Sequence, residues 1–351
     1  MLKEAMSKGN VIGAVGPGIW FLVPNRSRAV SEDRGPRLRQ DGKGTKQMKL
    51  TKMPRIAPFA ALAFSIVLAT VLAADLAAGG VFTSIDFPGA MMTVGRGINA
   101  EGEIVGWYLA ADGSQHGYIL REGVFNTIDF PGATATTTDG GPNPKGDVVG
   151  NYVDSGGVTH GYLLSRGDFT TIDFPGAAFT QTARYINSQG DIVGWYFDAT
   201  GNSHGFVFRR REDGQANGGT YTSIDVPGAL ATRAGGINSE EEIVGSYDDN
   251  VTTHGFLLSH GKFTTIDEPS ADPAGGGTFA WGINDSGTVV GSYFDSLGNP
   301  HAYLLRGTVF QTLDTMPTGH GQAFGINPQG DVVGQHDDDN GVIHGFLITK
   351  K

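Results

Sequence analysis

The stretch that decides the fold runs from residue 169 to residue 206. It reads Phe169-Thr-Thr-Ile-Asp173-Phe-Pro-Gly, then Tyr185-Ile-Asn187-Ser-Gln-Gly190-Asp-Ile-Val-Gly-Trp-Tyr196, and then His204-Gly-Phe206. The same phrase returns six times in the 351 residues, and its aspartate recurs at spacings of 43, 44, 52, 42 and 47. A period of this size is typical of repeat architectures, in which each copy is one supersecondary unit.

Every repeat contains four short segments with strand character. They are Phe-Thr-x-Ile-Asp, a segment leading into Gly-Ile-Asn, a third of the type Asp-Ile-Val-Gly-x-Tyr, and His-Gly-Phe-Leu-Leu. Tight turns join them: in Asn187-Ser-Gln-Gly190 the asparagine can accept backbone hydrogen bonds and the glycine can adopt a positive φ. The longest connection is the Pro-Gly-Ala stretch after Ile-Asp. Four hairpin-linked strands followed by a longer step form a propeller blade, so the sequence predicts an all-β, six-bladed β-propeller over residues 81–351.

The longest connection also sets the order of the strands within a blade. It places Gly-Ile-Asn at the end of the innermost strand and Phe-Thr-x-Ile-Asp on the outermost strand. The repeats then begin with an outermost strand, residues 81–86, and end with a third strand, residues 344–348. We expect strand 81–86 to complete the last blade, because this closes the ring and removes two exposed sheet edges. A parallel β-helix is the competing fold, but its coils are usually shorter and lack this regular hairpin chemistry.

The first 80 residues have a different composition from the repeats. Residues 1–47 are predicted to be disordered, or to be a leader that precedes the true translation start at Met48. Residues 48–73 have the basic start and the apolar centre of a signal peptide, and Val71-Leu72-Ala73 supplies small residues at the −3 and −1 positions for cleavage; an uncleaved membrane anchor is the alternative. Residues 74–80 form a linker. The sequence therefore predicts a secreted, extracellular or periplasmic protein that meets a membrane only through an uncleaved signal sequence.

Charge and cysteine content exclude several classes of function. Residues 1–73 contain 12 Lys or Arg and 4 Asp or Glu, which leaves 13 basic and 32 acidic residues of the totals of 25 and 36 for the rest of the chain. Such an acidic body argues against nucleic acid as a partner. The absence of cysteine excludes disulfides, thiol catalysis and zinc–thiolate sites. We expect no cofactor and a monomeric protein.

The repeated motif resembles a known family. Gly-Ile-Asn-x-x-Gly-x-Val-Val-Gly followed by His-Ala/Gly-Phe/Tyr-Leu is similar to the HAF family of extracellular repeats, which takes its name from a His-Ala-Phe triplet. His301-Ala302-Tyr303 and His204-Gly205-Phe206 match that triplet, and the resemblance spans residues 91–349. Here glycine often replaces the alanine. The resemblance implies an extracytoplasmic repeat protein without an established activity.

The residues that recur in every repeat are predicted to be structural. One active site needs one copy of each residue, whereas a histidine at the start of strand three and an aspartate at the end of strand four can join strands and turns in every blade. Aspartate-rich turns at 247–250 and 336–340 could bind calcium, but solvated hairpin tips are the simpler interpretation, and we expect no metal site. The recurring residues are His116, His160, His204, His254, His301, His344, Asp86, Asp129, Asp173, Asp225, Asp267 and Asp314.

Function is expected where the repeats differ. The residue just before Gly-Ile-Asn is Arg96, Arg184, Gly235, Trp281 or Phe324 in different blades, and Arg233 lies close to that position. On innermost strands these side chains face the central channel, where arginines beside aromatic rings could hold an anionic or sugar ligand. The alternative is that they only plug the channel.

The sequence gives little support for catalysis. Gly-x-Ser-x-Gly and His-Glu-x-x-His are both missing. His260, His320 and His336 stand outside the repeated histidine position, and His320 is the first candidate for an enzyme site at the channel mouth. We therefore expect a binding or scaffold module with a protein or glycan ligand; the alternative is a lyase or hydrolase of the propeller type.

Overall fold

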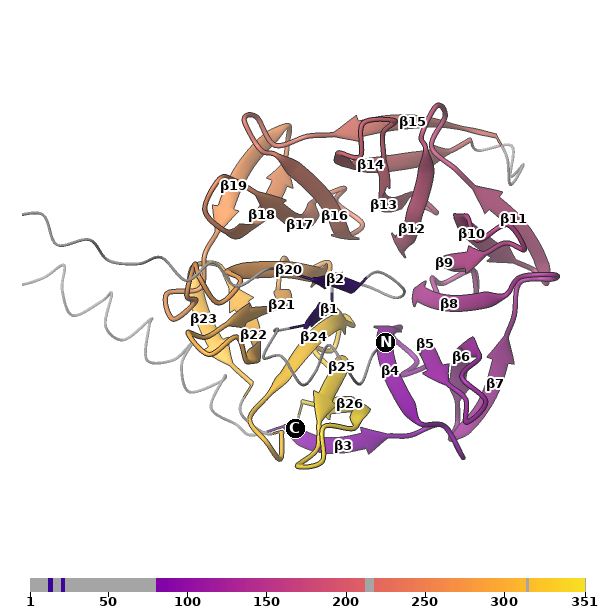
Figure 1. Ribbon diagram of the computed structural model, residues 1–351, viewed down its shortest axis with the longest axis horizontal. Coiled ribbons are helices and arrows are strands. Elements are labelled where there is room, and N and C mark those ends of the chain that lie inside the picture. The colour runs from indigo at the N-terminus through magenta and orange to yellow at the C-terminus, as the bar shows by residue number, and fades with distance from the viewer. Residues whose placement is uncertain (1–11, 15–19, 23–79, 212–217, 314–315, 351) are drawn as a thin grey trace, which may run out of the picture. The chain divides into compact units, whose positions relative to one another are not determined.

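The computed structural model describes residues 12–14, 20–22, 80–211, 218–313 and 316–350 (Figure 1). The chain divides into two units, Met1–Phe59 and Ala60–Lys351. In the first unit β1 (Ile12–Ala14) pairs antiparallel with β2 (Trp20–Leu22), within the segment that the sequence predicts to be disordered. The predicted signal peptide, residues 48–73, lies outside the described residues. Nowhere in the described parts of the chain is a helix long and apolar enough to cross a membrane.

The second unit is a ring of six antiparallel sheets of four strands each, which confirms the predicted all-β, six-bladed propeller (Figure 1). The first strands of neighbouring blades contact one another around the ring, so they are the innermost strands. From the inside outward, blades 1 to 3 are β4 (Met92–Ile98), β5 (Ile104–Leu109), β6 (Gln115–Arg121) and β7 (Val124–Ile128); β8 (Ala135–Gly140), β9 (Val148–Val153), β10 (Thr159–Ser165) and β11 (Asp168–Ile172); and β12 (Phe179–Ile186), β13 (Ile192–Phe197), β14 (Ser203–Arg210) and β15 (Gly219–Ile224).

Blades 4 to 6 repeat the arrangement. They are β16 (Ala231–Ile237), β17 (Ile243–Asp248), β18 (Thr253–Ser259) and β19 (Lys262–Ile266); β20 (Thr278–Ile283), β21 (Val289–Phe294), β22 (Pro300–Arg306) and β23 (Val309–Thr312); and β24 (Gly321–Ile326), β25 (Val332–Asp337), β26 (Ile343–Thr349) and β3 (Val81–Ile85).

The ring is closed by the strand from the start of the repeats. β3 pairs antiparallel with β26, in a register that runs from Gly345 opposite Ile85 to Thr349 opposite Val81. Asp86 follows β3 directly, and its Oδ1 lies 2.6 Å from His344 Nδ1. Blade 6 therefore contains strands from both ends of the repeat region, as the order of the segments predicts, and both β3 and β26 gain a partner.

Each blade is built on a glycine that lies under an aromatic ring. A Cβ on Gly106 of β5 would lie 1.9 Å from the carbonyl oxygen of Val94 and 2.9 Å from the ring of Tyr118. Tyr118 is fully buried, and its hydroxyl donates to that same carbonyl over 3.2 Å. The glycine is therefore required for a close approach between strands one and three. The same pair recurs as Gly150 with Tyr162, Gly194 with Phe206, Gly245 with Phe256, Gly291 with Tyr303 and Gly334 with Phe346.

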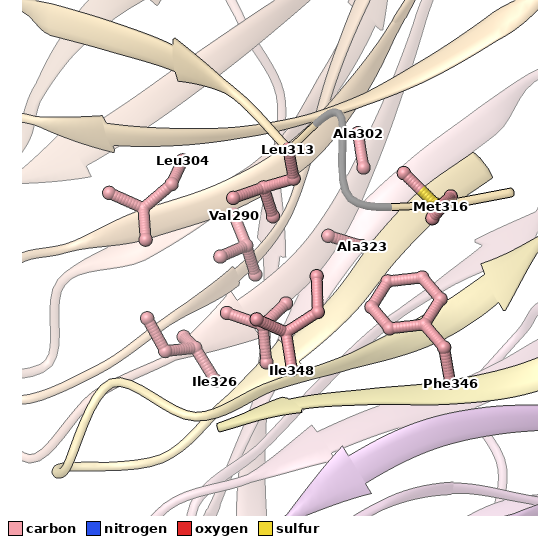
Figure 2. Packing of buried hydrophobic residues seen from close by; sticks show 10 residues of the cluster. Val290, Ala302, Leu304, Leu313, Met316, Ala323, Ile326, Phe346 and Ile348 are labelled. Carbon is pink, nitrogen blue, oxygen red and sulfur yellow. The ribbon is translucent and has the colours of Figure 1, made fainter. Parts of the chain in front are cut away.

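Neighbouring blades pack through aliphatic side chains on the facing sides of their sheets. Figure 2 shows the cluster between blades 5 and 6, in which Val290 and Leu304 of one blade meet Ile326 and Ile348 of the next. All four side chains are buried. Removing this apolar surface from water is the main force that holds blades together, at about 25 cal/mol per Å² of buried area.

A polar link from the turn after the innermost strand joins neighbouring blades at five of the six junctions; at the turn of blade 1, Asn99 Nδ2 donates to Glu103 instead. Asn187 Oδ1 accepts the backbone N–H of Asp191 over 2.8 Å, which fixes its own turn, while its Nδ2 donates to the carbonyl of Asn238 in the next blade over 3.2 Å. Both side chains are buried. The amide therefore acts within one blade and between two. The remaining inter-blade links of this kind are Asn143 to Asn187, Asn238 to Asn284, Asn284 to Asn327, and Asn327 to Asn99.

Candidate functional site

A β-bulge at the same position of every innermost strand builds a ring of side chains. In β4 the pairing with β5 shifts between Gly95 and Gly97, which leaves Arg96 outside the ladder. A bulge re-aims the side chain of the unpaired residue. The corresponding shifts occur in the other five innermost strands. The six bulge residues, called here the channel ring, are Arg96, Asp139, Arg184, Gly235, Trp281 and Phe324.

One carboxylate organises the charges of the channel ring. Asp139 Oδ1 lies 3.6 Å from Arg96 Nε and 3.8 Å from Arg184 Nη1. Its Oδ2 accepts hydrogen bonds from Thr137 Oγ1 at 2.9 Å, Asn151 Nδ2 at 3.0 Å and Thr182 Oγ1 at 3.1 Å. Asp139 is buried with both arginines. The ring therefore encloses two cations and one anion, a surplus of one positive charge.

The surplus charge is poorly solvated. The side chains of Arg96 and Arg184 are 10% and 3% exposed. Burial, with the charge of Arg184 as a smaller contribution, lowers the pKa of Arg96 to about 9 against the opposing effect of Asp139. Burial also lowers the pKa of Arg184. Arg96 Nε and Arg184 Nη2 have no hydrogen-bond partner among the described residues. A buried donor without a partner costs about 1–3 kcal/mol, so the ring retains unused capacity to bind an acceptor.

Aromatic rings from blades 5 and 6 form the other side of the channel ring. The guanidinium carbon of Arg96 lies 4.1 Å from the ring centroid of Phe324. That of Arg184 lies 5.6 Å from Trp281 and 5.5 Å from Phe324. Arg184 comes from blade 3, so these cation–π contacts span the channel. The ring residues therefore contact one another across the channel.

Half-buried aromatic surface adjoins the ring on blade 5. The rings of Phe279 and Trp281 stack with centroids 5.3 Å apart and planes 10° apart. Trp281 Nε1 donates to Ser292 Oγ over 3.1 Å, which fixes the indole. Both aromatic side chains are partly exposed, unlike Phe324. This stacked pair therefore presents partly exposed aromatic surface beside the channel ring.

A small cavity of about 140 Å³ lies at the end of the channel where the asparagine turns meet. Its walls include Ile98, Ile237 and Ile326 from three innermost strands, together with Tyr185. Tyr185 follows Arg184 directly, and burial raises its pKa to about 12, so it stays a neutral phenol. The cavity brings an aliphatic and aromatic lining close to the channel ring.

The structure brings four of the predicted ligand residues together and separates two. Arg96, Arg184, Trp281 and Phe324 form the ring, but Arg233 pairs with Asp248 over 2.6 Å and lies outside it. His320 Nδ1 lies 3.8 Å from Asp337 Oδ2, and the rings of His320 and His301 are perpendicular with centroids 5.8 Å apart.

Sequence reasoning missed Asp139. In repeat 2 Gly-Ile-Asn is replaced by Gly140-Gly-Pro-Asn143, which is one residue longer. Counting back from the turn asparagine, with one residue allowed for the insertion, would have found the ring position.

The repeated histidines contact the repeated aspartates far from the channel ring. His204 Nδ1 lies 2.7 Å from Asp225, and its Nε2 lies 3.4 Å from Asp198 on the hairpin before it. Burial alone would lower the pKa of His204, but the hydrogen bonds and charges of these aspartates outweigh it and raise the pKa. The corresponding Nδ1 contacts are His116 to Asp129, His160 to Asp173, His254 to Asp267 and His344 to Asp86. Asp314, predicted for His301, lies outside the described residues.

The aspartate-rich turns use their carboxylates on their own backbone. Asp249 Oδ1 accepts the N–H groups of Val251 and Thr252, and Asp338 Oδ1 accepts those of Asn340 and Val342. The described residues contain no group of three or more histidines and acidic residues arranged to hold a metal ion.

No protein-family model matches the chain, and no curated protein matches it. The chain is similar to several solved structures at low identity. These include a mutant of AofleA from Arthrobotrys oligospora (12% identity, 77% of this chain and 87% of that chain, TM-score 0.47), the six-bladed fucose-recognising Aleuria aurantia lectin (7%, 76% and 93%, 0.46) and Trypanosoma rangeli sialidase (9%, 77% and 60%, 0.48). The propeller fold itself follows from the strand pairing within this chain.

Proposed function

We propose that the chain is an exported binding module of the HAF type whose channel ring recognises an acidic group on a glycan. The observation that carries this proposal is the surplus buried positive charge of the ring. Arg96 and Arg184 share one carboxylate, and each retains an N–H group that has no hydrogen-bond partner in the described part of the chain. Charge and hydrogen-bonding capacity of this kind are satisfied by an anionic acceptor.

The chemistry of the site fits a carboxylate attached to a sugar ring. A carboxylate can accept two parallel N–H bonds from one guanidinium. The stacked Phe279 and Trp281 offer a partly exposed aromatic face on which the apolar face of a sugar can lie. Asp139 already neutralises one arginine, so a ligand with a single negative charge completes the balance of the ring.

The alternative of a lyase or hydrolase has no specific observation in its favour. Such an enzyme needs a free acid or base next to the substrate. Asp139 is the ring's carboxylate, and its oxygens already face two arginines and accept three hydrogen bonds. The six ring positions contain no histidine.

Export is part of the proposal. It rests on the basic start and apolar centre of residues 48–73, which predict a signal peptide, and on the resemblance of residues 91–349 to the HAF repeats. The acidic composition after residue 73 suits a monomer that binds neither nucleic acid nor an anionic membrane surface.

The test is a binding screen of the full chain against glycans with and without uronic or sialic acid residues. Arg184→Ala should weaken binding of the acidic glycans about 10- to 100-fold, because a hydrogen bond to a charged group contributes about 1.5–3 kcal/mol. Trp281→Ala should weaken it through the lost aromatic face. Arg121→Ala is the matched control, since Arg121 pairs with Glu103 on the surface over 2.7 Å. If Arg184→Ala and Trp281→Ala both leave the binding of every ligand unchanged, protein ligands included, the channel ring only fills the channel and does not bind the ligand.

A further inference from the structure

The turn after each innermost strand normally contains an acidic residue four positions after its asparagine. Blade 5 is the exception, because Asn284 is followed at this distance by Thr288. The hydroxyl of Thr288 lies 3.1 Å from that of Ser286, within the same turn. The acidic residues at this position in the other blades are Glu103, Asp147, Asp191, Glu242 and Asp331.

In other blades this acid pairs with a cation from one of two places. Glu103 Oε1 lies 2.7 Å from Arg121 Nε at the end of the third strand of the same blade. Asp147 Oδ2 accepts a hydrogen bond from Arg210 Nη1 of the following blade over 2.9 Å, and both of these side chains are nearly buried. The acidic residue at this position can therefore form an ion pair with a cation of its own blade or with a cation of the following blade.

Blades 5 and 6 keep both cations although the acid is missing. Arg306 stands five residues after His301, as Arg121 stands five after His116. Lys350 stands six residues after His344, as Arg210 stands six after His204. The repeat thus places both cations next to the position that Thr288 occupies.

A cavity of about 330 Å³ lies at this place. Its walls include Arg306, Lys350, Thr288, Ser286 and Gly330. The two cationic side chains converge on Gly330, since a Cβ there would lie 3.8 Å from Arg306 Nη2 and 3.7 Å from Lys350 Cδ. Within the described part of the chain, neither cationic side chain has a carboxylate within ion-pair distance.

Asp331, which follows Gly330 in the turn of blade 6, is already engaged. Its Oδ1 accepts the backbone N–H of Lys350 over 3.0 Å, and its Oδ2 accepts Asn327 Nδ2 over 3.0 Å. It does not line the cavity. As far as the described residues line it, the cavity therefore combines two cations, two hydroxyl groups and no carboxylate.

We infer that this cavity binds an oxyanion, phosphate or sulfate, either free or esterified on a saccharide. The anion takes the place of the side-chain carboxylate that the repeat supplies elsewhere, with Arg306 and Lys350 as its cationic partners. The site uses none of the channel-ring residues, so its test is independent of the function proposed for the channel.

The experiment titrates the full chain with inorganic phosphate, sulfate, a sulfated monosaccharide and its unsulfated parent, at constant ionic strength, by calorimetry. Thr288→Glu restores the missing carboxylate and should weaken anion binding at least about 10-fold, which corresponds to 1.4 kcal/mol. Thr288→Gln has nearly the same shape as Thr288→Glu without the charge, so it should bind the anions at least about 10-fold more tightly than Thr288→Glu does. Arg306→Ala should lose binding, and Arg121→Ala should keep it.

Thermal unfolding of each variant shows whether a loss of binding comes from a loss of folding. We expect Thr288→Glu to be at least as stable as the unchanged protein. Tighter binding of the sulfated sugar than of free sulfate identifies an esterified ligand, and equal binding identifies the free ion. The inference is wrong if none of the anions binds saturably, or if Thr288→Glu binds them as tightly as Thr288→Gln.

Discussion

Replacing Asn187 by aspartate should weaken the junction between blades 3 and 4 while leaving the turn of blade 3 intact. The carboxylate keeps the acceptor for Gly190 and Asp191, whose N–H groups lie 3.0 Å and 2.8 Å from Asn187 Oδ1. It removes the N–H group that donates to the carbonyl of Asn238 over 3.2 Å. An oxygen then faces an oxygen at a site where both residues are buried.

The magnitude follows from the groups left behind. The lost hydrogen bond contributes about 1 kcal/mol. The Asn238 carbonyl still accepts the backbone N–H of Glu241 over 3.3 Å, but the new carboxylate oxygen is buried opposite it without a donor, which costs about 1–3 kcal/mol. The free energy of unfolding should therefore fall by about 2–4 kcal/mol. For a propeller of this size the melting temperature should fall by about 4–7 °C. Urea unfolding followed by tryptophan fluorescence measures the change, and an unaltered slope with denaturant shows that the folded state remains comparable.

The matched control is Asn126→Asp, which makes the same chemical change on the exposed face of β7 and should stay within about 0.5 kcal/mol of the unchanged protein. The deficit of Asn187→Asp should also shrink as the pH falls, because a protonated carboxyl group can donate to the Asn238 carbonyl again. The reasoning is refuted if Asn187→Asp and Asn126→Asp have the same stability.

Three further changes test the rest of the fold. Deletion of residues 81–86 should expose β26 to proteolysis and lower the urea midpoint, because β26 loses β3 and His344 loses Asp86; a ring of unchanged stability would contradict the closure. Gly245→Ala should lower the free energy of unfolding by at least about 1–3 kcal/mol, because its Cβ would lie 2.1 Å from the Arg233 carbonyl. Gly205→Ala should lower it less, since Ala302 occupies the same place in blade 5, and equal losses of stability would contradict this packing. Hydrogen bonds lower the pKa values of Asp249 and Asp198, so the stabilisation that these carboxylates give is present above pH ~4 and lost in acid. The pKa values of His204 and His254 are raised, so the stabilisation that these histidines give is present below pH ~6.5 and lost as the pH rises. The melting temperature should therefore decline from pH ~6 to pH ~8, and it should decline less in His204→Gln with His254→Gln; identical slopes would exclude these histidines as the cause.

The sequence was sufficient to predict the architecture of the blades because the turns and the strand order are encoded locally. Asn187 and Gly190 mark a hairpin by their own chemistry, and the Pro-Gly-Ala connection separates one sheet from the next. The closing role of β3 follows from the order of segments alone. Closure needs only that the first segment be of the outermost type and the last of the third type.

The composition of the channel ring could not be predicted to the same depth. Its side chains are aimed by bulges, and a bulge depends on the pairing register between strands, which the local sequence does not specify. Arg184 and Arg233 look alike in the sequence, yet one reaches across the channel and the other pairs with Asp248. The hydrogen bond from Asn187 to Asn238 of the next blade depends on the spacing between two blades, which the sequence of a single repeat does not determine.

The central claim is that Arg184 holds surplus positive charge for an acidic ligand, and one thermodynamic cycle tests it most directly. An acidic sugar that binds in the screen and its uncharged amide are titrated into the full chain and into Arg184→Ala. We expect the unchanged protein to prefer the acid over the amide at least about 10-fold and Arg184→Ala to lose most of this preference, a coupling of about 1.4 kcal/mol or more. An equal preference in both proteins would contradict the claim.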